Sequence, residues 1–227
     1  MSKIIDVTGI TQEGMWNYEA PFPKIKITPL PPVPWVKGDV YCEIFDGLHS
    51  QTGTYLETPA HYYGNDNPRT YLLIDLPVEK LVDVPCVVLD LGLWDMGASR
   101  RAITAELLES CPNALSVREG DALLVCTGWG RFWMHPDYLA LGPYFTKGAM
   151  DWILSKKPFI LGSDSAVWEN LENLEGFFPD FYAADVLMLT PLVNLEQVKA
   201  PRCSLTALPF KVPCTSCAPC RAVIRVD

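Results

Sequence analysis

Histidine is scarce in this chain, and clusters of basic residues are missing. Only 3 of the 227 residues are His, which argues against a metal site built from several imidazoles. The longest basic groups, such as Arg100-Arg101 and Lys156-Lys157, are short, and the formal net charge is −9. A nucleic-acid backbone is bound by clustered Lys and Arg, so we expect no nucleic-acid partner.

Long apolar runs are also missing. Residues 84–93 are among the longest, yet they are far shorter than a membrane span and contain Pro85 and Asp90. The N-terminus, Met1-Ser2-Lys3-Ile4, lacks the apolar core of a secretory signal. We therefore expect a cytoplasmic location and no membrane partner. In that compartment the 8 cysteines are expected to be reduced and mostly buried thiols.

Proline is abundant, with 20 residues gathered towards the two ends of the chain. Residues 20–34 contain six prolines, which exclude a helix and disfavour a central strand. We interpret residues 1–35 as an extended N-terminal arm of a single domain that spans residues 1–227. The arm would lie along the domain or along a neighbouring subunit.

Apolar and β-branched runs alternate with helical patterns in the rest of the chain. Strands are expected at 40–45, 81–91, 122–127 and 159–162, with a last strand pair at 186–189 and 222–226. Helices are expected at 103–110, with Thr104 as N-cap, and at 147–155. Mixed strands and helices of this kind predict an α/β or α+β domain.

One segment carries most of the chemical information. Residues 51–61 read Gln-Thr-Gly-Thr-Tyr-Leu-Glu-Thr-Pro-Ala-His. This segment resembles the signature His-x-Gly-Thr-His-x-Asp-x-Pro-x-His of the cyclase family, which includes kynurenine formamidases and isatin hydrolases. The matching positions are Gly53, Thr54, Pro59 and His61.

Weaker similarities to this family follow in the same order along nearly the whole chain. They lie at residues 4–8, 127–129, 161–165, 194–195, 208–210 and 219–223. The resemblance implies an α/β fold of the kynurenine formamidase type, a swivelling β/β/α domain with a central mixed β-sheet. It also implies assembly as a homodimer or homotetramer, for which the proline-rich arm is suited.

The departures from the signature concern the metal. In the family, two His and one Asp of the signature ligate zinc or manganese, and Gln51, Tyr55 and Glu57 stand at those positions here. A further Glu and His would correspond to Thr190 and, more loosely, Phe178. An amide oxygen is a poor ligand for these ions, and a Tyr would have to ionise. We therefore expect no metal cofactor; the alternative is a divalent cation such as Zn or Mn held by Glu57 and His61.

The residues that remain support acid/base chemistry. Glu57 could orient the imidazole of His61 and raise its basicity, with His61 as the catalytic acid/base. Gln51, Tyr55, Thr54 and Trp129 are the expected substrate-binding residues. The resemblance then implies a divergent hydrolase or lyase for a small amide, lactam or lactone-type carbonyl compound. The alternative is a catalytically silent relative that binds a small molecule or acts as an assembly partner.

Other side chains leave two interpretations open. Cys214, Cys217 and Cys220 have a spacing compatible with zinc or a redox pair, although free thiols are favoured. The dense aromatics of residues 129–144 could line a flat apolar pocket or form core contacts. His49 and His135 are expected in solvated loops, and Asp164 is expected to cap backbone amides.

Overall fold

The central element of the computed structural model, which describes residues 2–38 and 40–227, is an eight-stranded mixed sheet. Its spatial order is β1, β12, β11, β5, β7, β9, β10 and β4. The bounds are β1 Lys3–Asp6, β4 Tyr55–Glu57, β5 Val84–Asp90, β7 Ala122–Cys126, β9 Ile160–Ser163, β10 Leu187–Thr190, β11 Cys203–Pro209 and β12 Cys217–Val226. Because β4 also pairs with β12, the sheet closes into a barrel. The predicted α/β fold with a central mixed sheet is confirmed.

The parallel strands β5, β7, β9 and β10 are buried on both faces, which explains their continuous apolar runs. In β7, Leu124 and Cys126 belong to the core inside the barrel. Leu123 and Val125 face the opposite way and belong to the core beneath the helices. The period-two alternation of a strand therefore separates two cores with one run of apolar residues.

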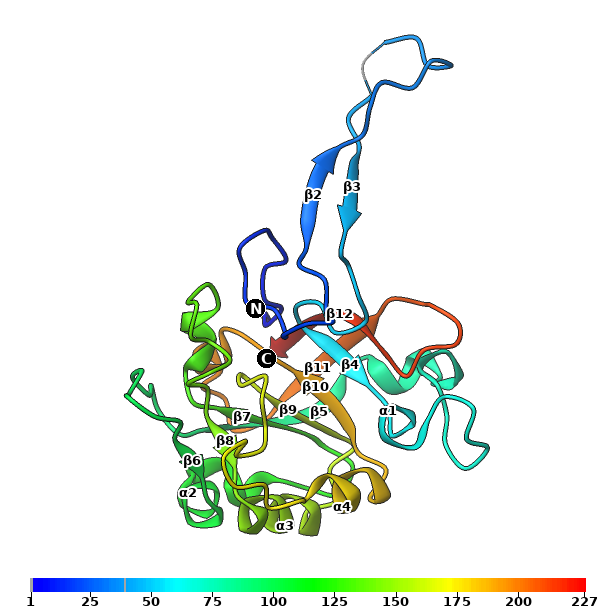
Figure 1. Ribbon diagram of the computed structural model, residues 1–227. Coiled ribbons are helices and arrows are strands. Elements are labelled where there is room, and N and C mark those ends of the chain that lie inside the picture. The colour runs from blue at the N-terminus through cyan, green and yellow to red at the C-terminus, as the bar shows by residue number, and fades with distance from the viewer. Residues whose placement is uncertain (1, 39) are drawn as a thin grey trace.

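Helices cover the outer face of this sheet (Figure 1). They are α2 Ala105–Ser110, α3 Lys147–Ser155 and α4 Phe178–Ala183, and a short α1 Ala60–Tyr63 follows β4. Thr104 caps α2 as predicted, because its side chain accepts a hydrogen bond from the Leu107 amide. Single 3₁₀ turns lie at Leu73–Asp75, Val78–Leu81, Pro112–Ser116, Trp129–Phe132 and Leu195–Gln197. No helix within residues 2–38 and 40–227 is both long and apolar enough to cross a membrane.

In the C-terminal region one predicted pairing differs from the structure, and one strand was not predicted. The segments expected as a last strand pair belong to β10 and β12, which are both strands but do not pair with each other. β12 pairs over most of its length with β11, and β10 lies between β9 and β4. The strand β11 follows a proline and carries polar residues at alternate positions, so it lacks the apolar run that marked the others.

The proline-rich segment forms one side of a hairpin that projects away from the barrel (Figure 1). β2, Lys26–Pro29, pairs with β3, Glu43–Asp46, in a separate two-stranded sheet. Trp35 and Tyr41 near its tip are 81% and 85% exposed. The extended arm expected over residues 1–35 does not include its first residues, because Lys3–Asp6 form β1 in the main sheet. A second small sheet pairs β6, Ala102–Ile103, with β8, Tyr144–Phe145.

Candidate active site

The site is built on β4 and the turn that follows it. β4 lies between β10 and β12, so its three residues are buried. Side chains alternate along a strand, and Leu56 packs in the barrel core while Tyr55 and Glu57 face a cavity. Thr58 and Pro59 lead directly into α1, which places His61 four residues after Glu57.

The Gly53-Thr54 turn positions β4 without reaching the cavity. Gly53 has φ +69°, and a Cβ there would lie 2.8 Å from Thr11 Oγ1, so glycine is required. Thr54 Oγ1 donates to the Pro191 carbonyl at 2.6 Å and accepts from the Gly9 amide at 2.9 Å. The prediction that Thr54 binds substrate is therefore not supported by its position. Its hydroxyl joins three chain segments.

The cavity has a volume of about 550 Å³ and contains four of the predicted site residues, Gln51, Tyr55, Glu57 and His61. Most of its remaining wall is aromatic and comes from distant parts of the sequence. These aromatic residues are Tyr18, Phe22, Tyr62, Trp168, Phe178 and Tyr182. Two of them had a sequence signal from the family resemblance: Tyr62 directly follows His61 of the signature, and Phe178 corresponds loosely to the family's further His position.

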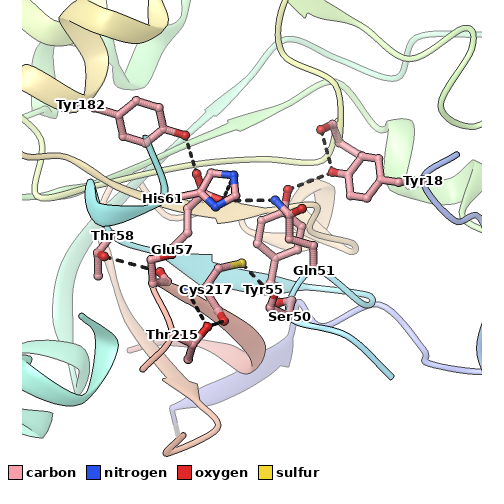
Figure 2. Close-up of polar contacts among 12 residues, drawn as sticks. Tyr18, Ser50, Gln51, Tyr55, Glu57, Thr58, His61, Tyr182, Thr215 and Cys217 are labelled. Carbon is pink, nitrogen blue, oxygen red and sulfur yellow. Dashed lines mark hydrogen bonds and ion pairs between the residues drawn. The ribbon is translucent and has the colours of Figure 1, made fainter. Parts of the chain in front are cut away.

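Glu57 is the buried charge of this site. Its side chain is 1% exposed, and Oε1 accepts a 2.5 Å hydrogen bond from the Tyr182 hydroxyl (Figure 2). Oε2 has only weak partners, with Gln51 Nε2 at 3.4 Å and His61 Nε2 at 3.9 Å. Burial raises the pKa of Glu57, and the nearby His61, Tyr182 and Gln51 partly oppose that rise.

His61 stands at the edge of the cavity with its side chain 41% exposed. Its separation from Glu57 is an ion-pair distance and is too long for a hydrogen bond. The imidazole can therefore reach both solvent and the buried carboxylate. This is the arrangement that a group needs when it exchanges protons with a bound ligand.

Two tyrosine hydroxyls form a second polar element of the cavity. The Tyr55 and Tyr18 oxygens are 2.9 Å apart, and Tyr18 also donates to the Ala166 carbonyl at 3.2 Å. Desolvation raises the pKa of both phenols. They are neutral hydrogen-bond donors at neutral pH, and a phenolate is disfavoured in this position.

Trp129 lies outside the cavity, contrary to its prediction as a substrate-binding residue. It is 2% exposed, and its indole N–H donates to the Tyr138 carbonyl at 3.0 Å. It packs in an aromatic cluster with Trp16, Trp133 and Tyr138. For these aromatics the core interpretation is the one that the structure supports, because their large apolar surfaces join the N-terminal segment to the barrel.

The side chains at the family's metal positions do not suit a transition metal. Tyr55 is held neutral, and Gln51 offers only an amide group. Thr190, which lies opposite Tyr55 on β10, donates its hydroxyl to the Ser165 carbonyl at 2.7 Å, and Phe178 has no donor atom. Glu57 and His61 are two ligands where zinc takes three or four. Throughout the described chain, no three His, Cys, Asp or Glu side chains form a group that could hold a metal ion.

The three C-terminal cysteines lie in different surroundings. Cys217 and Cys220 are buried residues of β12, whereas Cys214 is exposed in the preceding turn. The Cys217 thiol donates to the Ser50 carbonyl at 3.2 Å. These cysteines are free thiols in the structure.

The remaining titratable candidates lie elsewhere. His49 contacts Asn17 at 3.3 Å, and His135 forms an exposed pair with Asp137. Asp164 is buried and accepts hydrogen bonds from the amides of Thr127 and Trp129, both at 2.9 Å. The prediction that Asp164 caps backbone amides is confirmed.

Comparison with known proteins defines the class. The family model "Cyclase: Putative cyclase" matches residues 5–170, more than half of the chain. The chain therefore belongs to the Cyclase family. No curated protein matches the sequence.

Solved structures agree with this assignment in their fold. An isatin hydrolase bound to the product analogue thioisatinate has a TM-score of 0.83 at 21% identity and covers 99% of this chain and 92% of its own. Isatin hydrolase A from Ralstonia solanacearum has a TM-score of 0.79 at 19% sequence identity, and the match covers 100% of this chain and 92% of that one. A "Potential Metal-Dependent Hydrolase With Cyclase Activity" has a TM-score of 0.72 at 22% sequence identity, and the match covers 100% of both chains.

Proposed function

We propose that the chain is a hydrolase or lyase for a small amide, lactam or lactone-type carbonyl compound, and that it acts without the family's usual metal site. The observation that carries the proposal is the Glu57–His61 pair at an aromatic cavity of about 550 Å³. Family membership and the structural likeness to proteins described as hydrolases support hydrolytic chemistry.

In this proposal His61 acts as the general base. It takes a proton from water, and the resulting hydroxide adds to the carbonyl carbon of the substrate. The C–N or C–O bond then breaks, and the proton passes from His61 to the departing nitrogen or oxygen. The buried carboxylate of Glu57 stabilises the imidazolium between these two steps.

Hydrogen-bond donors on the same wall serve the oxyanion. Because Tyr18 gives its single proton to the Ala166 carbonyl, Tyr55 is the donor of this pair and can turn its proton to the developing negative charge on the substrate oxygen. The amide of Gln51 is the second candidate donor. Each such donor contributes about 3 kcal/mol to transition-state stabilisation in enzymes that depend on an oxyanion hole.

A screen of small aryl amides, lactams and lactones tests the proposal, with His61→Asn compared against wild type. We expect the variant to lose at least about 100-fold in kcat/KM, because a positioned acid/base contributes about that much. His135→Asn is the matched control, since His135 lies outside the cavity, where its exposed ring contacts Asp137 at 3.8 Å. Equal losses in both variants, or turnover that survives in His61→Asn, would contradict the assigned role.

Elemental analysis of protein purified without chelator or a histidine tag tests the metal-free part. We expect only traces of zinc and manganese, because the donor set lacks a third good ligand. About one equivalent per chain, lost in a Glu57→Ala/His61→Ala double variant, would show a metallohydrolase with unusual ligands.

A binding protein without catalytic activity is the second candidate. It is favoured by the 3.9 Å gap between Glu57 and His61, which leaves the pair without a direct hydrogen bond. Ligand binding in the cavity without turnover of any compound in the screen would support this candidate over the first.

A further inference from the structure

The charged side chains of the cavity wall are mostly of one sign. Glu57 and Glu169 are the acidic residues of the lining, and among the described residues that line the cavity there is no Lys or Arg. Within this described lining, His61 is the one residue whose side chain can carry a positive charge. With both carboxylates ionised and His61 protonated, the lining still has a net negative charge.

The basic residue bonded to this wall is directed elsewhere. The Arg100 guanidinium donates to the backbone carbonyls of Gly142, at 2.7 Å, and Pro143, at 3.2 Å. It also donates to the carbonyls of Val167 and Glu169, two residues of the wall. Arg100 therefore fixes the position of the wall, while its N–H groups are already bonded to backbone oxygens.

Glu57 has unused acceptor capacity on the cavity side. An ionised carboxylate has about four acceptor positions, and the contacts of Oε2 are a 3.4 Å hydrogen bond from Gln51 and a 3.9 Å separation from His61 that is too long for a hydrogen bond. A buried carboxylate with a weakly bonded oxygen is costly unless a proton or a cationic donor reaches it. Burial raises the pKa of Glu57 in the same surroundings.

The rest of the wall suits a flat ring. Phe178 stacks on Tyr182 at 5.8 Å, and Tyr182 stacks in turn on Tyr62 at 5.2 Å. Trp168 stands in the same lining. Aromatic side chains beside a carboxylate favour ligands that combine an aromatic ring with a positive charge.

We propose that the cavity selects a flat aromatic ligand with a cationic nitrogen group, such as an ammonium or amidinium, and that Glu57 is its counter-ion. This inference rests on the proposed function, since it names the substrate class for the same cavity. A cavity of this charge has one consequence for hydrolysis. A carboxylate product is repelled by the ionised Glu57 and is released readily.

Three small probes of the same shape test the charge preference directly. Benzamidine is cationic, benzamide is its neutral counterpart, and benzoate is anionic. We expect titration calorimetry on the wild type to show benzamidine binding at least about tenfold more tightly than benzamide, with benzoate weakest. Glu57→Gln keeps the shape of the side chain and should reduce that preference to less than about threefold.

Glu172→Gln is the matched control, because Glu172 is an exposed acid three residues after the cavity residue Glu169 and does not itself line the cavity. It should keep the full preference for benzamidine, and circular dichroism verifies that both variants are folded. Equal wild-type affinities for benzamidine and benzamide would overturn the inference. So would a benzamidine preference that persists in Glu57→Gln.

The binding result is separable from catalysis. If the protein binds benzamidine no more tightly than benzamide while turnover of neutral amides depends on His61, the inference of a cationic ligand fails and the proposed function stands. If benzamidine binds through Glu57 but no compound is turned over, the proposed hydrolase fails and the cationic ligand class stands.

Discussion

Glu57 and Asp164 are both buried carboxylates, at 1% and 2% exposure, yet their surroundings differ. Asp164 accepts three hydrogen bonds, two from the backbone and side chain of Thr127 and one from the Trp129 amide, and it lines no described cavity. Glu57 has one short hydrogen bond, from Tyr182, and a weakly bonded oxygen beside a cavity. The difference shows that burial alone does not mark a functional acid. Unused acceptor capacity next to open space does.

The largest expected effect is on stability at Asp164. Asp164→Ala leaves two buried backbone amides and one hydroxyl without acceptors, so it should lower the free energy of unfolding by about 3–5 kcal/mol. Asp164→Asn keeps an amide oxygen for the backbone donors and should cost much less. Urea unfolding at neutral pH measures both, and equal losses would show that charge matters more than acceptor geometry.

The pH dependence of stability should also originate partly at Asp164. Burial raises its pKa from 3.8 to about 6, so between these values the folded state keeps a proton that the unfolded state has released. Its contribution to stability is fully present below pH 3.8 and is lost as the pH rises through about 6. The difference between wild type and Asp164→Asn should fall by about 3 kcal/mol across that window. A difference that stays constant in urea unfolding would mean that the three donors keep Asp164 ionised throughout.

A smaller effect is expected when a single donor is removed. Thr127→Val deletes the hydroxyl that bonds Asp164 at 2.8 Å but keeps the backbone amide. Because hydrogen bonds to charged groups contribute about 1.5–3 kcal/mol, the loss of stability should lie at the low end of that range. Thermal unfolding measures it, and a loss as large as that of Asp164→Ala would contradict the division among three donors.

The smallest stability change is expected at Glu57 itself. Glu57→Gln removes a poorly paired buried charge and keeps an acceptor for Tyr182, so the free energy of unfolding should change by less than about 1 kcal/mol. The same urea measurement applies. A loss comparable to Asp164→Ala would mean that Glu57 is a structural residue, and the contrast between the two acids would disappear.

Much of the barrel could be predicted from the sequence because its parallel strands are buried on both faces. β5, β7 and β9 appear as apolar runs for that reason. β4 has only three residues, and its place depended on the family signature rather than on a pattern. Apolar runs therefore predicted part of the fold, and the family signature at residues 51–61 predicted another part.

The site was only half accessible to sequence reasoning. Gln51, Tyr55, Glu57 and His61 share one segment, whereas Tyr182 reaches Glu57 across 125 positions of sequence. Nothing local marks such a contact. Trp129 lies in a core cluster and not on the cavity wall, and the sequence could not separate the two because a Trp has the same sequence signal in both places.

The projecting hairpin carries a risk of aggregation. A protruding β-ribbon with aromatic side chains at its tip is a template on which other chains can add strands and aggregate. Pro29, Pro31, Pro32 and Pro34 have no backbone N–H, so this side of the ribbon cannot continue a hydrogen-bonded ladder. The proline content therefore allows the chain to display apolar side chains far from its core while blocking the growth of a fibre.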